Sequence, residues 1–197
     1  YTTLFRSGKA LLLQQDNQSE AALALLESQS TLSEQLPPLL LLRARLMQGL
    51  DRSEEALPLL EDGLEQHPND ARIRLAYARL LVEQGELDAA QLEFTTLLQQ
   101  NPEDDDLRLS LALLSMEVKA WNEAQAYLRD LIDRERHLDM AHFNLGLTHE
   151  ALNDNEGALI EYSLVRPGSE YLPAKAQQTS LLLAEQRVED ARQRLAQ

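Results

Sequence analysis

The sequence contains no cysteine, which excludes disulfides, thiol catalysis and thiolate metal sites without choosing a compartment. It has only seven glycines and seven prolines in 197 residues. Basic residues are also scarce: 18 Lys and Arg against 33 Asp and Glu give a formal net charge of −15. This charge argues against partners that are nucleic acids or anionic membrane surfaces. No run approaches the roughly 18 apolar residues of a membrane span, so we expect no direct membrane insertion.

What the sequence does have is leucine and alanine, spread along its whole length. Hydrophobic residues make up 44% of the chain and charged residues 26%, a balance that supports a sizeable folded core. With so few glycines and prolines, this composition favours helices over strands. The sequence therefore predicts an all-α protein.

Small residues recur with a period of 34. One series is Ala22, Ala56, Ala90, Ala124 and Ala158; a second is Ala10, Ala44, Ala78 and Ala112, continued by Gly146. Large residues stand four positions after the first series, at Leu26, Leu60, Phe94, Leu128 and Tyr162. Two helices can approach closely where each presents a small side chain, while large neighbours fill the grooves beside them. The pattern predicts repeated helix–turn–helix hairpins that stack on one another.

This pattern resembles the tetratricopeptide repeat (TPR) family, whose unit is a helical hairpin of this length. The segment from Ala71 to Asp104 carries Ala78, Gly85, Ala90, Phe94 and Pro102 at the family's signature positions. The resemblance implies a right-handed superhelical solenoid of helix–turn–helix hairpins. We expect a single array over residues 8–197. Its units would be residues 3–36, 37–70, 71–104, 105–138 and 139–171, with an incomplete sixth unit at 172–197.

Both ends of the sequence favour a piece of a longer array. The first seven residues, YTTLFRS, resemble the translated end of a widely used sequencing adapter, so we expect residues 1–7 to be a scar. The alternative is a natural helix start. A one-residue irregularity falls near the other end, where the step from Ala158 to Ala191 is 33 residues. It predicts an early helix end and a longer loop at Pro167–Tyr171, which is either a harmless loop change or a contact point.

The sequence offers little chemistry. His142 and His149 share a helix face, but as packing residues rather than a metal pair, and His67 and His137 fall in turns where we expect them to be solvated. The acidic run Glu103–Asp106 lacks the spacing and glycine of a calcium loop and is predicted to be a solvated turn. No phosphate-binding loop or nucleophile elbow is present. We expect no enzyme activity, no metal and no cofactor.

The TPR resemblance also implies where partners bind. In this family the first helix of each unit lines a concave groove, so the groove positions of each unit predict a binding surface. Those positions give Leu41, Arg45, Arg72, Leu75, Arg79, Val82, Leu109, Leu113, Met116, Met140, Phe143, Asn144 and Leu147. Asn144 is the only match to the clamp with which some TPR domains hold chaperone tails, so we do not expect that role. An apolar strip with arginines at one end suits protein segments with hydrophobic anchors and some negative charge.

The function we expect is a non-enzymatic scaffold that binds protein segments in this groove. Residues 94–132 and 152–174 further resemble outer-membrane TPR lipoproteins of Gram-negative bacteria. That resemblance implies an adaptor that brings cell-wall hydrolases to a periplasmic C-terminal-processing protease, anchored to the outer membrane through a lipidated N-terminus upstream of this sequence. Without the closer resemblance a cytoplasmic location is expected. The alternative is a regulatory or substrate-recruiting TPR region of a larger multidomain enzyme.

Overall fold

The computed structural model describes residues 18–28, 36–184, 186–187 and 191, and every regular element among them is a helix. The chain divides into two compact units, residues 1–97 and 98–197. The first unit contains α2 (Ser19–Glu27), α4 (Pro37–Gly49), α5 (Ser53–Gln66), α6 (Ala71–Gln84) and most of α7 (Leu87–Gln100). The second contains α8 (Asp105–Glu117), α9 (Trp121–Asp133), α10 (Leu138–Ala151), α11 (Asn155–Leu164) and α12 (Tyr171–Ala184). The all-α prediction is confirmed.

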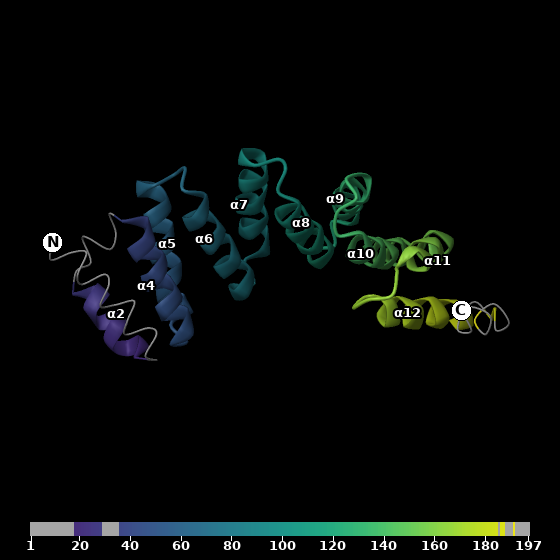
Figure 1. The fold of residues 1–197 in the computed structure, drawn as a ribbon, viewed down its shortest axis with the longest axis horizontal. Coiled ribbons are helices and arrows are strands. Elements are labelled where there is room, and N and C mark those ends of the chain that lie inside the picture. The colour runs from purple at the N-terminus through teal and green to yellow at the C-terminus, as the bar shows by residue number, and fades with distance from the viewer. Residues whose placement is uncertain (1–17, 29–35, 185, 188–190, 192–197) are drawn as a thin grey trace. The chain divides into compact units, whose positions relative to one another are not determined.

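Within each unit, several helices pack against the helix that follows them in the chain (Figure 1). In the first unit α4 packs against α5, and α5 against α6; in the second, α8 packs against α9, α9 against α10, and α10 against α11. First helices also touch the next first helix, since α4 contacts α6 and α8 contacts α10. This is the stacking that the 34-residue period predicts. The proposed adapter scar at residues 1–7 and Ala10 lie outside the described residues.

The small residues of the repeat lie inside the hairpins, as predicted. Ala78, Ala90, Ala112 and Ala124 are all fully buried. Gly146 is packed closely: a Cβ atom there would lie 2.4 Å from Cε1 of the Tyr162 ring, closer than atoms in contact allow. The three preceding repeats have alanine at this position and Leu60, Phe94 or Leu128 at the large one. The glycine thus makes room for the larger tyrosine.

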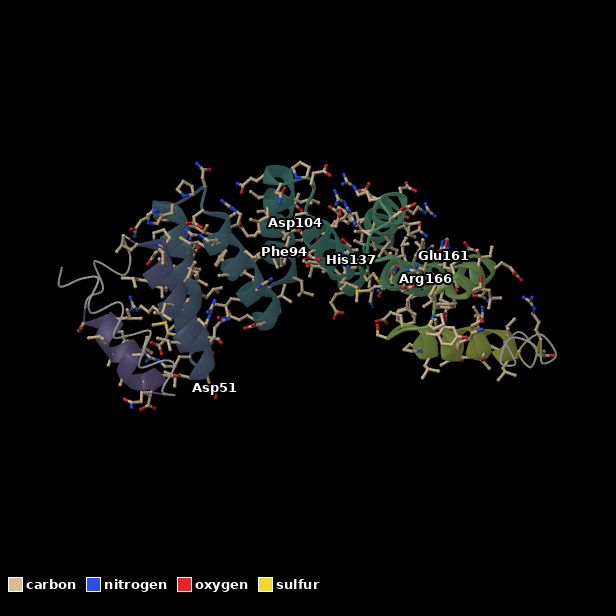
Figure 2. The ribbon with its side chains drawn as sticks, in the orientation of Figure 1. Asp51, Phe94, Asp104, His137, Glu161 and Arg166 are labelled. Carbon is tan, nitrogen blue, oxygen red and sulfur yellow. The ribbon has the colours of Figure 1, made fainter. Side chains whose placement is uncertain are left out.

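The first helices that the structure describes all end in the same backbone motif. The residue that closes it has a positive φ and recurs every 34 residues at Asp51, Gly85, Lys119 and Asn153, then 33 residues later at Gln186. The next residue donates its backbone N–H to a carbonyl five positions back, as Glu86 does to Leu81 at 2.9 Å. Such a bond satisfies carbonyls that the helix end leaves unpaired. Asp51 lies at this turn after α4 (Figure 2).

Lys119→Gly is expected to stabilise the protein by about 1 kcal/mol, because a side chain in the left-handed region costs roughly that much and glycine avoids it. Asn153→Gly is the matched control at the same position of the next repeat; asparagine tolerates this conformation, so its gain should be smaller. The measurement is the urea midpoint followed by circular dichroism. A midpoint that falls for Lys119→Gly would contradict the expectation.

The irregularity near the end of the chain shortens one helix. α11 ends at Leu164, before Pro167, and α12 begins at Tyr171, so the predicted early end and longer loop are present. Arg166 fixes the start of this loop, since its guanidinium and its backbone N–H all bond to the Asp139 carboxylate at 2.9 to 3.0 Å. These contacts lower the pKa of Asp139. Tyr171, at the end of this loop, is half-buried, with the Lys175 ammonium 5.6 Å from its ring centre.

Candidate functional site

Two separate hollows contain most of the predicted groove residues, one in each unit. The hollow of the first unit lies between α4 and α6 and has a volume of about 480 Å³. Five predicted residues line it, namely Leu41, Arg45, Arg72, Leu75 and Arg79. The hollow of the second unit has a volume of about 390 Å³ and is lined by the predicted residues Leu113, Met116, Asn144 and Leu147. We refer to them as the α4–α6 hollow and the α8–α10 hollow.

The α4–α6 hollow combines leucines with arginines. Leu41 and Arg45 are one turn apart on α4. Leu75 and Arg79 hold the same positions on α6, because each lies 34 residues after its counterpart on α4. The leucines are partly buried, whereas both arginines are exposed. The helix surface that faces the hollow therefore has an apolar row beside a cationic row.

Other residues of the α4–α6 hollow are held by local contacts. Asp70 caps α6 by accepting the Arg72 backbone N–H at 2.9 Å, and it also binds the Arg72 guanidinium at 2.6 Å. These bonds lower the pKa of Asp70 and occupy Arg72. Gln48 donates its side-chain amide to Glu83 at 3.2 Å. Glu83 is the one carboxylate among the residues that line this hollow, and an amide rather than a guanidinium occupies it.

Both apolar and polar side chains line the α8–α10 hollow. Leu113 is 41% exposed, and Met116 and Leu147 are partly buried at its wall. Trp121 and Glu117, which the sequence did not single out, also line it. Asn144 is buried and donates its amide to the Met140 carbonyl at 2.8 Å, so its role within α10 is partly structural.

Four predicted groove residues lie outside both hollows. Leu109 packs against the α8–α10 core, and Phe143 packs against the core around Tyr162, with the two ring centres 6.0 Å apart. Val82 is 40% exposed but lines neither hollow, and Met140 borders a third depression beside Asp139 and Arg166. Leu109 and Phe143 therefore serve packing as well as any binding role.

At the fourth position of three successive units, the structure places a largely covered basic side chain beside a carboxylate, a pairing that the sequence did not predict. Arg74 pairs with Glu93, Arg108 with Asp130, and His142 Nδ1 lies 2.7 Å from Glu161 Oε2. The side chain of Arg108 is only 5% exposed and also bonds to Asp105 and to the Pro102 carbonyl, both at 2.6 Å. Since each carboxylate comes from the second helix of the pair, these contacts join the two helices.

The acidic run Glu103–Asp106 is more than a solvated turn. Asp104 caps α8 by accepting the Leu107 backbone N–H at 3.0 Å, and Asp105 lies beside Arg108 and Arg134 (Asp104 is labelled in Figure 2). Glu103 also pairs with Arg134, at 3.0 Å. Arg108 of α8 and Arg134 at the end of α9 thus pair with Asp105 and Glu103, whereas Glu103 and Asp106 remain largely exposed, as the prediction of a solvated turn has it.

The prediction that His67 and His137 are solvated holds for His137, which is exposed, with its Nε2 2.9 Å from the Asp106 carboxylate. It is wrong in part for His67, whose Nε2 is buried without a hydrogen-bond partner in the described structure. Both histidines do lie at helix ends, but their position in the sequence does not show which side chains pack around them.

The remaining histidines pair with carboxylates rather than with each other. His149 Nδ1 lies 2.7 Å from Asp154 Oδ2, and Asp154 also accepts the Gly157 backbone N–H, which together lower the pKa of Asp154. Across the described ranges, no group of three or more His, Asp or Glu side chains is arranged to hold a metal ion. None of the helices described here has the length and apolarity needed to cross a bilayer.

Stacked helical hairpins with buried small residues and open hollows on their first helices define the class of helical-repeat scaffolds. Profiles of the tetratricopeptide repeat match residues 13–80, 50–114 and 81–145, and a second such profile matches residues 120–171. Since these matches cover most of the sequence, the chain belongs to the tetratricopeptide repeat family. Domains of this family bind proteins or peptides and are generally non-enzymatic scaffolds.

Individual relatives agree with this assignment. A TPR repeat-containing protein of Pseudomonas aeruginosa is 55% identical over 58 residues, which make up 29% of this chain and 10% of that protein. A tetratricopeptide repeat protein from Parabacteroides merdae has a similar structure, with a TM-score of 0.76 and 16% identity over 97% of this chain and 76% of that one. MamA from Desulfovibrio magneticus RS-1 gives a TM-score of 0.71 and 15% identity, with 82% and 91% covered. At these identities the structural likeness concerns the fold.

Proposed function

We propose that this chain is a protein-interaction scaffold that binds partner segments in its α4–α6 and α8–α10 hollows. The observation that supports it most directly is that nine predicted groove residues line these two hollows. Apolar side chains at the wall of an open depression, with a few polar groups beside them, are typical of sites that take up a partner's side chain.

A peptide-display selection against the full chain tests this proposal. Peptides selected on the wild-type protein should lose about tenfold or more in affinity when Leu113→Asp or Leu75→Asp places a carboxylate in the hollow that they occupy. The matched controls are Ile160→Asp and Leu92→Asp, the same substitution at residues that are 59% and 66% exposed and line neither hollow. Circular dichroism verifies that every variant keeps its helices.

The outcome that contradicts the scaffold role is equal affinity in the hollow variants and the controls. Leu109 and Phe143 are also predicted groove residues, but they are less suitable positions for this experiment. Because both pack against the core, their loss would lower stability and binding together.

The finer form of this proposal is an adaptor that recruits cell-wall hydrolases to a periplasmic C-terminal-processing protease. It is supported by the resemblance of residues 94–132 and 152–174 to outer-membrane TPR lipoproteins of Gram-negative bacteria. Co-purification of such a protease with the full-length protein, lost on Leu113→Asp and kept on Ile160→Asp, is the expected result. A catalytic domain encoded in the same gene would instead favour the TPR region of a larger enzyme.

A further inference from the structure

Arg45 and Arg79 stand apart from most other cations of this chain. Acidic residues outnumber Lys and Arg by 33 to 18, and eight described arginines have carboxylate partners. Within the described ranges, Arg45 and Arg79 make no ion pair, although both are exposed and face the same hollow. Glu83 is the carboxylate that lines this hollow, and it accepts a hydrogen bond from the Gln48 amide instead.

The two guanidinium groups are carried at matching positions. Arg45 on α4 and Arg79 on α6 are 34 residues apart, and these two helices contact each other within the first unit. Packed helices lie about 8–10 Å apart, so two arginines at the same position of neighbouring helices present their positive charges at about that spacing. Leu41 and Leu75 repeat the arrangement one turn earlier.

We infer that the α4–α6 hollow binds an extended protein segment that carries two carboxylates three residues apart beside apolar side chains. This rests on the scaffold function proposed above and specifies the partner of one of its two sites. In the polyproline II conformation, residues three apart lie on one face and are separated by about 9 Å, which matches the helix spacing. Each carboxylate pairs with one arginine, because guanidinium groups suit carboxylates geometrically. Adjacent apolar side chains contact Leu41 and Leu75.

The unpartnered arginines carry this inference because an exposed cation in so acidic a protein is easily neutralised from within. Arg72, in the same hollow, shows this, since Asp70 binds it through both carboxylate oxygens. A ligand that supplies two carboxylates would give Arg45 and Arg79 what the described part of the chain does not. The overall charge of −15 disfavours a polyphosphate ligand such as a nucleic acid.

The test is isothermal titration calorimetry of the full chain with a synthetic peptide that has glutamate at every third position and leucine between. A probe with glutamine in place of each glutamate is the matched ligand. The glutamate probe is expected to bind at least about tenfold more tightly, because each of its carboxylates can form charge-assisted hydrogen bonds with a guanidinium group. Its affinity should fall as salt is raised.

The double variant Arg45→Gln/Arg79→Gln is expected to remove this preference, lowering the affinity for the glutamate probe by at least about tenfold. The control Lys119→Gln/Arg129→Gln removes the same two charges from exposed positions in the second unit, outside both hollows, and should leave the affinity within about twofold. Equal affinities for the two probes, or an unchanged affinity in the first double variant, overturns the inference. So does a single-stranded oligonucleotide that competes as well as the glutamate probe.

Failure of this inference is distinguishable from failure of the scaffold role. One distinguishing outcome is that selected peptides lose affinity on Leu113→Asp while the affinity of the glutamate probe is unchanged by Arg45→Gln/Arg79→Gln. In that case the α8–α10 hollow still binds segments and only the carboxylate preference is wrong. If no selected peptide responds to a change in either hollow, the scaffold role itself is contradicted.

Discussion

Gly146→Ala is expected to destabilise the protein by about 1–3 kcal/mol, the usual cost of overpacking a core. Alanine normally stabilises a helix interior relative to glycine by up to about 1 kcal/mol, so the sign here is opposite to helix propensity. The reason is the Tyr162 ring, whose nearest atom would lie 2.4 Å from the new Cβ. The ring is 2% exposed, and its hydroxyl donates to Glu150, so it has little freedom to move. Burial, with Glu150 adding to it, raises the pKa of this tyrosine.

Adding Tyr162→Leu should rescue Gly146→Ala, because alanine facing leucine is the pair that the preceding repeat has at Ala112 and Leu128. In a double-mutant cycle the two substitutions should couple by about 1 kcal/mol or more, with the double variant more stable than their sum predicts. Gly49→Ala is the control, since nothing lies within 4 Å of the position a Cβ would take there. Urea unfolding measures all four variants, and a Gly146→Ala midpoint at or above that of Gly49→Ala would contradict this packing account.

Arg108→Ala is expected to destabilise the protein by about 2–3 kcal/mol. Loss of one member of a buried ion pair usually costs about 3–5 kcal/mol, and the cost is lower here because Asp130 is 47% exposed and can be solvated. The substitution also removes the hydrogen bond to the Pro102 carbonyl, and Asp105 keeps only its ion pairs with Arg134 and Arg136.

Arg129→Ala is the matched control for Arg108→Ala, because Arg129 is exposed on α9 and removes the same charge. Its free energy of unfolding should change by less than about 0.5 kcal/mol. Urea unfolding at neutral pH compares the two variants. Equal stabilities would show that the Arg108 contacts contribute nothing beyond a surface charge.

The sequence predicted the parts of this molecule that depend on local spacing. The 34-residue period located the hairpins, and the burial of Ala78, Ala90 and Ala112 followed from the need for small residues where two helices approach. The early end of α11 also followed, since Pro167 and the 33-residue step lie in the sequence itself.

Features that depend on which side chains meet could not be predicted in this way. Arg74 and Arg108 occupy the same repeat position, yet their carboxylate partners lie 19 and 22 residues further on, at different positions of the second helix. His142 and Glu161 are again 19 residues apart, so two of the three pairs share a spacing, but no single spacing predicts all three. The left-handed residues after first helices are likewise visible only where glycine or asparagine stands, at Gly85 and Asn153 but not at Lys119.

The repeat period also does not predict which groove positions line a hollow and which pack against the core. Leu109 and Leu113 are both groove positions of α8, but the first packs against the core and the second lies in the α8–α10 hollow with 41% of its surface exposed. One helical turn separates these outcomes, and only the packing of α10 against α8 decides between them.

Trp121 gives the α8–α10 hollow an intrinsic optical label. It is the only tryptophan in the chain and lies at the wall of that hollow, whereas no tryptophan lines the hollow between α4 and α6. Indole emission shifts with the polarity around the ring, so a ligand that displaces water beside Trp121 changes the colour of the protein's fluorescence. Occupancy of the second unit can thus be followed in the native protein without an attached dye.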